Sequence, residues 1–377
     1  MKILVNTSNL VIGGAIQVAL SLINEFSKRE DSLYYVIICS KQIQAQINIE
    51  SFPKNFKFYV LEKSPSKLRT RRRTVLKLDN IERSEKPDIV FSVFGPTYWT
   101  PKTKHLMGFA LGLITNPKSL FYKKISLKNR IHLFLLNNYQ RYYTLKNSNI
   151  FWCETEDVKS KMIKYLGLKN SNIFVIGNTH ASYYKENYDR VFNLPKRSKS
   201  EFRLITISAN YLHKNLSIIL EVSKIMKEKG LNVKFYLTLP KADFNNLFHN
   251  ADKLGILNLG IVDAKDCPFI YEQADALFLP TLIESFTASF PEAMIMKKPI
   301  LTSNLSFARE ICKDAALYFE PLDPVDISKK IILLMENDEK RFQLIQNGLE
   351  RVKSFPNSHE RADFIITTLK TILKKIN

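Results

Sequence analysis

Short runs of consecutive apolar residues recur along the chain, and most are separated by longer stretches with helical spacing. In the first half such runs occupy residues 2–7, 34–39, 56–61, 88–94, 105–109, 151–153 and 174–176. In the second half they occupy residues 203–208, 233–239, 276–279 and 299–303, and residues 255–262 hold one more. Runs of this length are typical of buried parallel strands. Their alternation with helical segments predicts an α/β protein built on doubly wound parallel sheets.

The length of 377 residues indicates two domains. Residues 181–200 are polar and basic, contain Pro195, and have the composition of a linker. We therefore expect an N-terminal domain over residues 1–182 and a C-terminal domain over residues 183–355.

Residues 356–377 are expected to form a separate last helix. Ser358 or Asn357 suits its N-cap. Its apolar stripe for docking consists of Phe364, Ile365, Leu369 and Ile372.

The composition, 45% hydrophobic and 24% charged, is that of a folded soluble protein. The four cysteines lie far apart with no Cys-x-x-Cys, which argues against a zinc site or a disulfide framework and fits a reducing cytosol. The chain starts directly as a strand, with no signal peptide before it. No apolar run approaches the roughly 20 residues of a spanning helix. We expect a cytoplasmic protein.

Positive charge is concentrated in the first half of the chain. Of a net +20, residues 1–180 contribute 28 Lys and Arg against 12 Asp and Glu, and residues 181–377 contribute 28 against 24. Such a field attracts nucleic acid or the anionic inner leaflet of a membrane. Because no nucleic-acid-binding motif accompanies the charge, we expect no nucleic-acid partner.

Two stretches of the first half carry this charge. Residues 69–73 are a basic run, and residues 118–146 interleave basic residues with aromatic and aliphatic ones. The second stretch suits either a core helix with a solvated basic face or a surface that docks on anionic lipid.

Two carboxylates, Glu284 and Glu292, follow the apolar run 276–279. The first lies on a loop, and the second lies on a helix that Thr287 or Ser289 could cap. A helix start beside the carboxyl end of a parallel strand suits phosphate or hydroxyl groups, and carboxylates accept hydrogen bonds from sugar hydroxyls. The alternative is that both glutamates are solvated surface charges.

Two further loops follow predicted strands. Lys214 lies in the loop 209–215 after the run 203–208, at the N-terminal end of a helix that extends to about residue 229. This arrangement favours an anion site. The alternative is that the lysine is a surface residue without a ligand. Gly13-Gly14 follows the first strand. It is not Gly-x-Gly-x-x-Gly, so it suits either a Rossmann-like phosphate loop or only a tight turn.

The stretch from Glu284 to Pro321 resembles the retaining, nucleotide-sugar-dependent GT-B glycosyltransferases of the GT4 family (glycosyl transferases group 1). The resemblance rests on Glu284, seven intervening residues, Glu292 and then Ala293-Met294, and it continues through Ser303, Ala308-Arg309-Glu310 and Asp314-Ala315-Ala316. It implies two Rossmann-like domains that face a cleft, with the last helix crossing back onto the N-terminal domain.

The resemblance also implies roles for individual residues. Lys214 would grip the donor diphosphate, Glu292 the ribose hydroxyls, and Glu284 the hydroxyls of the donor sugar. The Gly13-Gly14 loop would lie near the acceptor and the donor phosphates, and the backbone around Val262 would meet the base. No Asp-x-Asp is present, so no metal is expected.

The chain departs from the family pattern at three places. Ala209 replaces an arginine, whose charge His213 would partly supply. Ser285 and Thr287, on either side of Phe286, replace glycines and add hydroxyls near the donor sugar. The usual N-domain histidine is missing after the fifth strand, which leaves His105 as the acceptor-side candidate.

These features predict a retaining hexosyltransferase at the inner face of a bacterial membrane. It would use a nucleotide-diphosphate sugar as co-substrate, with no other cofactor. We expect the acceptor to be a lipid-linked saccharide in O-antigen or lipopolysaccharide synthesis. Two alternatives remain: a GT-B sugar-nucleotide epimerase, and a non-enzymatic basic protein that binds polyanions or membranes.

Overall fold

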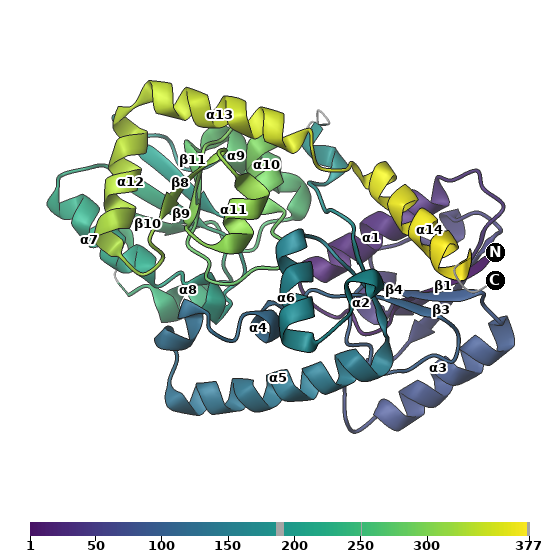
Figure 1. Ribbon diagram of the computed structural model, residues 1–377. Coiled ribbons are helices and arrows are strands. Elements are labelled where there is room, and N and C mark those ends of the chain that lie inside the picture. Colours follow the sequence, from purple (N-terminus) through teal and green to yellow (C-terminus); the bar gives the residue numbers. More distant parts are fainter. Residues whose placement is uncertain (186–191, 250, 375–377) are drawn as a thin grey trace. The chain divides into compact units, whose positions relative to one another are not determined.

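The computed structural model describes residues 1–185, 192–249 and 251–374, which divide into two compact units (Figure 1). Unit 1 comprises Met1–Pro117, Ser126–Asn178 and the chain from Pro356 onward. Unit 2 comprises Lys118–Ile125 and Thr179–Phe355. The chain therefore passes between the units at four places, and the short segment Lys118–Ile125 belongs to unit 2 although both of its flanks belong to unit 1.

Unit 1 is built on a seven-stranded parallel sheet in the order β3-β2-β1-β4-β5-β6-β7. Its strands are β1 (Lys2–Thr7), β2 (Tyr34–Ser40), β3 (Phe56–Leu61), β4 (Ile89–Ser92), β5 (His105–Gly108), β6 (Ile150–Cys153) and β7 (Ile173–Val175). Its helices are α1 (Gly14–Ser27), α2 (Lys41–Gln44), α3 (Arg71–Glu85), α4 (Gly112–Thr115), α5 (Leu127–Asn147), α6 (Glu156–Leu166) and α14 (Ser358–Lys374), with 3-10 turns η1 (Ile49–Ser51) and η3 (Asn170–Asn172).

Unit 2 is built on a six-stranded parallel sheet in the order β10-β9-β8-β11-β12-β13. Its strands are β8 (Phe202–Thr206), β9 (Val233–Leu237), β10 (Ile256–Asn258), β11 (Ala276–Leu279), β12 (Ile300–Ser303) and β13 (Ala316–Phe319). Its helices are α7 (Ile218–Glu228), α8 (Lys241–Leu247), α9 (Cys267–Gln273), α10 (Ser289–Ile295), α11 (Ser306–Cys312), α12 (Pro324–Glu336) and α13 (Asp338–Val352). Short 3-10 turns complete it: η2 (Leu120–Lys124), η4 (Ser182–Lys185), η5 (Leu212–Lys214), η6 (Ala251–Leu254) and η7 (Ala264–Asp266).

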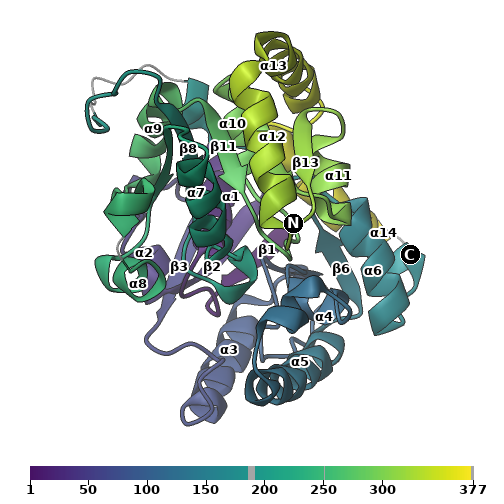
Figure 2. The same ribbon diagram turned by 90° about the vertical axis from the view of Figure 1, so that its left-hand side faces the viewer.

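The two sheets share one topology. In each sheet the second and third strands lie on one side of the first strand, and the later strands lie on its other side, as in a Rossmann fold. Helices cover both faces of each sheet, and Figure 2 shows α7 and α12 packed side by side in unit 2. The predicted fold class, with two Rossmann-like domains, is confirmed.

The last helix, α14, completes the core of unit 1. It packs beside α1 (Figure 1), and Ile365, Leu369 and Ile372 are buried in the same cluster as the first strands. Phe364 was expected in this stripe but is 54% exposed, and Ala362 and Ile366 take its place. The helix begins at Ser358, and the side chain of the preceding Asn357 accepts a hydrogen bond from the Glu360 backbone N–H.

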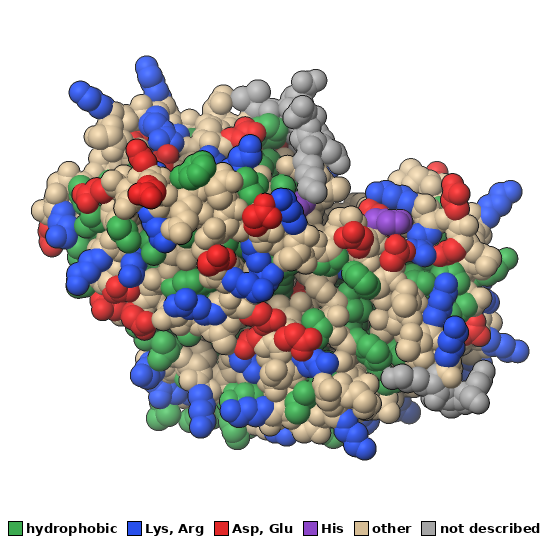
Figure 3. Space-filling model, turned by 45° about the horizontal axis from the view of Figure 1, so that its top comes forward, with side chains coloured by type: hydrophobic (Ala, Val, Ile, Leu, Met, Phe, Trp, Pro, Cys, Tyr) green, Lys and Arg blue, Asp and Glu red, His purple; other side chains and the backbone are tan. Residues whose placement is uncertain are grey.

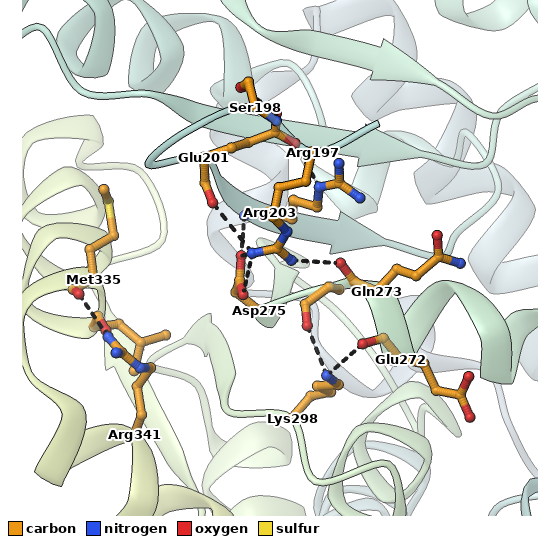
Figure 4. Close-up of polar contacts among 12 residues, drawn as sticks. Arg197, Ser198, Glu201, Arg203, Glu272, Gln273, Asp275, Lys298, Met335 and Arg341 are labelled. Atoms are coloured by element: carbon orange, nitrogen blue, oxygen red, sulfur yellow. Dashed lines mark hydrogen bonds and ion pairs between the residues drawn. The ribbon is translucent and has the colours of Figure 1, made fainter. Parts of the chain in front are cut away.

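Residues 192–200 do not form the expected linker. Leu194 is buried in unit 2, Arg197 pairs with both oxygens of Asp275, and Arg203 pairs with Glu201 at 2.6 Å. Figure 4 shows the two arginines and their carboxylate partners beside Lys298, whose ammonium donates to the carbonyls of Glu272 and Ala274. The rest of the expected linker includes residues 186–191, which lie outside the described residues.

Helix α5 is far more exposed than a core helix. Within α5 only Thr144 and Asn147 are buried, whereas Leu127, Ile131, Phe134 and Leu135 are each more than half exposed. The interpretation of this stretch as a core helix is therefore wrong.

We predict that Leu369→Ala lowers the free energy of unfolding of unit 1 by about 2–5 kcal/mol, because it leaves a cavity at a fully buried position of α14. Phe364→Ala on the same helix is the matched control and should change stability by less than about 0.5 kcal/mol. Urea unfolding followed by circular dichroism measures both. Equal losses in the two variants would contradict the packing described for α14.

Candidate functional site

Lys214 and Glu284 meet because their loops leave adjacent strands. Strands β8 and β11 are neighbours in unit 2, with Leu204 opposite Ala276, and the strand order of the sheet reverses between them. In parallel sheets the loops at such a reversal form the usual ligand site, at the carboxyl ends of the strands. The loop after β8 carries Lys214, and the loop after β11 carries Glu284.

The two side chains form an ion pair that is largely shielded from solvent. Lys214 Nζ lies 2.5 Å from Glu284 Oε1, and the side chains are 13% and 10% exposed. The hydroxyl of Thr281 lies 2.8 Å from the same carboxylate oxygen and donates to it. No sequence motif marks Thr281, although its position directly after β11 and Pro280 was a usable signal.

The two loops are also joined through their backbones. The N–H of Leu282 donates to the carbonyl of His213 at 2.7 Å. The carbonyl of Leu282 accepts from the hydroxyl of Ser119 at 3.2 Å, and the buried Phe121 ring packs edge-on against His213. The segment Lys118–Ile125 thus braces the loop that carries Glu284, a role that no sequence pattern predicted.

Lys214 lies in η5 and not in the first turn of α7, which begins four residues later at Ile218. The lysine therefore lies in the loop before α7, as predicted, and Asn215, in a left-handed conformation, turns the chain between the two elements.

Burial opposes the positive charge that His213 was expected to supply in part for the missing arginine. Its ring stacks on Tyr211 with centroids 5.5 Å apart, and burial lowers its pKa from 6.5, against the opposing pull of Glu284. This shift favours the uncharged imidazole. Lys214 is then the residue that brings positive charge to Glu284.

Glu292 lies on α10 among tyrosines. Its Oε2 accepts from the Tyr271 hydroxyl at 3.3 Å. Burial raises the pKa of Glu292 to about 7, while the hydroxyls of Tyr184 and Tyr271 oppose this shift. These tyrosines come from η4 and α9, and nothing in the sequence indicated their approach. The expected capping of α10 by Thr287 or Ser289 does not occur, since Ala288 is its N-cap.

The residues between the glutamates are mostly buried in unit 2. Ser285 and Thr287 are each 8% exposed, and Ser285 Oγ has no hydrogen-bond partner in the described part of the chain. Phe286 packs edge-on against Phe355 at 6.2 Å. A buried hydroxyl without a partner beside Glu284 is available to a polar ligand.

Val262 follows Gly260, which has a φ of 78°, and Val262 is partly buried against the core of unit 2. Only glycine adopts this left-handed conformation readily. The contact of this turn with a base remains a prediction.

In unit 1, Gly13 and Gly14 follow β1, and Gly13 (φ 76°) is the N-cap of α1. No heavy atom lies within 4 Å of the position that a Cβ would take at Gly14, so the backbone there is open to close approach. The ligand roles of both glycines remain predictions.

His105 is a core residue of unit 1. It is 5% exposed, its Nδ1 lies 2.8 Å from the carbonyl of Asn147, and its Nε2 lies 2.7 Å from the Ser92 hydroxyl. Burial lowers the pKa of this histidine to about 4. Since both ring nitrogens are engaged within the protein, the expected acceptor-side role of His105 is wrong.

Among the described residues, no three His, Cys, Asp or Glu side chains are placed to hold a metal ion together. In the same residues no helix has the length and apolar character needed to span a bilayer.

Residues 188–351 match the family model described as Glycosyl transferases group 1. The chain is 32% identical to the O-antigen chain mannosyltransferase B of Escherichia coli over 97 residues, 26% of each chain. It is 26% identical to an uncharacterized 41.2 kDa protein in the cps region of Klebsiella pneumoniae over 207 residues, or 48% of this chain. These matches span 26% and 58% of the length of the two relatives.

Solved structures match nearly the whole chain at low identity. A glycosyltransferase from Rickettsia africae ESF-5 has a TM-score of 0.72 at 16% identity, covering 99% of this chain and 98% of that one. Anabaena HepE in complex with UDP and glucose has 0.69 at 13%, covering 98% and 100%. WaaG, a glycosyltransferase involved in lipopolysaccharide biosynthesis, has 0.67 at 13%, covering 97% and 99%. At these identities the likeness establishes the fold.

We predict that Glu292→Gln raises the free energy of unfolding above that of the wild type, and that this gain is larger at pH 8 than at pH 5. The folded chain holds the Glu292 proton up to about pH 7, whereas the unfolded chain releases it near the usual value of 4.5. Wild-type stability therefore falls as pH rises through this window, and glutamine removes the loss. The gain above pH 7 reaches at most about 3 kcal/mol. Thermal unfolding of both proteins at the two pH values measures it, and a gain that does not depend on pH would refute it.

Proposed function

We propose that the chain is a retaining hexosyltransferase, because residues 188–351 match the glycosyl transferases group 1 model and the fold is that of GT-B glycosyltransferases. It moves a hexosyl unit from a nucleotide-diphosphate sugar to a saccharide acceptor. The observation that carries this proposal is the pairing of Lys214 with Glu284 at the strand-order reversal of unit 2.

This geometry suits departure of a nucleotide diphosphate. Negative charge develops on the diphosphate as its bond to the sugar breaks, and a lysine held in a shielded site stabilises that charge without a metal ion. Glu284 accepts hydrogen bonds from the sugar hydroxyls, with Thr281 fixing one of its oxygens. Ser285 adds a hydroxyl beside it, and Glu292 receives the ribose. Glu284 therefore positions the sugar, and transfer on the same face retains the anomeric configuration.

The acceptor is a lipid-linked saccharide of bacterial surface polysaccharide. Support comes from the two relatives, one named as an O-antigen mannosyltransferase and one named for a cps region, and from WaaG, which is named for lipopolysaccharide biosynthesis. HepE is described with UDP and glucose, which supports a nucleotide-sugar donor. A sugar-nucleotide epimerase of the same fold would release free sugar nucleotide without an acceptor, so product analysis separates the two activities.

The protein acts in the cytoplasm and docks on the inner face of the membrane through α5. The exposed apolar residues of α5 lie at helical spacing on one stripe: Leu127, Ile131, Phe134, Leu135, Tyr142 and Leu145. At 100° per residue, Lys128 and Lys146 fall on one side of this stripe and Arg130 and Arg141 on the other. This is the pattern of a helix that lies in a lipid interface.

The charge around α5 favours anionic lipid. Between Asp88 and Glu154 the chain has nine Lys and Arg residues and no acidic one. On the face drawn in Figure 3, by contrast, basic side chains are spread among acidic ones, which gives no support there to a general polyanion-binding surface. Attraction to anionic headgroups and insertion of the apolar stripe act together.

The donor prediction is tested with UDP-, GDP-, ADP-, dTDP- and CMP-linked sugars and the free nucleotides in a thermal-shift panel. One base should stabilise the wild type by roughly 2.7 kcal/mol at a hundred times its Kd. The same ligand should shift Lys214→Ala and Glu292→Ala by clearly less than the wild type. NMR of the product should show the anomeric configuration of the donor, and EDTA should leave the rate unchanged. Inversion, or no shift with any nucleotide, would refute the proposed function.

The membrane prediction is tested by flotation with phosphatidylglycerol vesicles. Phe134→Ser with Leu135→Ser should abolish flotation, because it removes the centre of the apolar stripe while leaving all basic residues in place. Phe342→Ser is the matched control, since Phe342 is 64% exposed on α13 of unit 2. Flotation that is equal on neutral phosphatidylcholine, or unaffected by the double substitution, would exclude α5 as the docking surface.

A further inference from the structure

The ammonium group that the proposed function assigns to the donor diphosphate already has a partner within the protein. Lys214 Nζ lies 2.5 Å from Glu284 Oε1, and neither side chain is more than 13% exposed. A diphosphate that takes Lys214 must therefore separate this pair. Separating a shielded ion pair is costly when one charge is left without a partner.

An intact nucleotide-sugar donor offers a new partner to each side chain of the pair. Its diphosphate takes the ammonium of Lys214, and the hydroxyls of its sugar donate to the carboxylate of Glu284. A nucleotide diphosphate without the sugar satisfies only Lys214. It leaves Glu284 beside the phosphates, where two negative charges repel and the carboxylate has lost its cation.

We propose that Glu284 is an internal competitor of the diphosphate for Lys214, so that the site selects the intact nucleotide-sugar over the nucleotide-diphosphate product. This inference rests on the proposed function and concerns the same site. Once the sugar has left, the carboxylate recovers Lys214 and displaces the diphosphate, which favours product release.

The surroundings of the pair support an exchange of partners. The Thr281 hydroxyl, 2.8 Å from Glu284 Oε1, keeps the carboxylate in place when Lys214 moves to phosphate. The backbone bond from Leu282 to His213 holds the two loops together during the exchange, because it does not involve either charged side chain. Glu284 is thus a specificity-determining residue as well as a group that positions the sugar.

The test is a double-mutant cycle of Glu284→Gln and Lys214→Met, measured by isothermal titration with UDP, UDP-glucose, GDP and GDP-mannose. Glu284→Gln should bind the diphosphate roughly threefold or more tightly than the wild type, because Lys214 is no longer engaged. The same variant should bind the diphosphate sugar no more tightly. In the Lys214→Met background, Glu284→Gln should change diphosphate binding by less than about twofold.

Two controls isolate the pair from general charge effects. Glu339→Gln removes an exposed carboxylate from α13 in the same unit and should leave all four affinities unchanged. Equal tightening by Glu284→Gln in the wild-type and Lys214→Met backgrounds would mean that only long-range charge acts, and would overturn the proposal. Unchanged or weaker diphosphate binding in Glu284→Gln would overturn it as well.

The failures of the two proposals are distinguishable. If the wild type binds a diphosphate and its sugar form but the cycle shows no coupling, only this inference fails. If the wild type binds none of the four probes and the wider nucleotide panel also shows no shift, the proposed function fails, and this inference with it.

Discussion

The pairing of β8 with β11 in the middle of the second sheet is the constraint on which the candidate site depends. Seventy residues separate Lys214 from Glu284 in the sequence, yet adjacent parallel strands deliver both loops to one sheet edge. The ion pair, the backbone bond from Leu282 to His213, and the contact of Thr281 with Glu284 all follow from that adjacency. A longer loop after either strand would carry different side chains, but it would still begin at the same edge of the sheet.

The sequence predicted the parts of the structure whose signals are local. Apolar runs located nearly all the strands, and helical spacing located most of the longer helices. A buried strand or helix face requires apolar residues at regular spacing, which the sequence shows directly. Glu284 after β11 and the lysine after β8 indicated the two loops that the structure brings together. The expected linker failed at Leu194 and Arg197, because a polar composition does not reveal burial of a leucine or pairing with Asp275.

The remaining differences are long-range. Tyr184 and Tyr271 reach Glu292 from other elements, and Ser119 reaches Leu282 across 163 residues of sequence. Contacts between segments this far apart leave no pattern of residue spacing in the sequence. His105 shows the opposite error: a histidine at a strand start suggested chemistry, but its two ring nitrogens are bound to Asn147 and Ser92. The exposure of α5 also needed the structure, since a stripe of leucine and phenylalanine suits a core as well as a lipid surface.

The placement of α14 affects the order in which the chain can fold during synthesis. The cluster that joins α1 to the first strands also contains Ile365, Leu369 and Ile372, which follow the whole of unit 2 in the sequence. Domains that emerge early usually fold first. Unit 1 begins first here, but part of its core stays uncovered until unit 2 has been made. The nascent N-terminal unit therefore exposes apolar surface for most of translation, a period in which chaperones protect such surfaces.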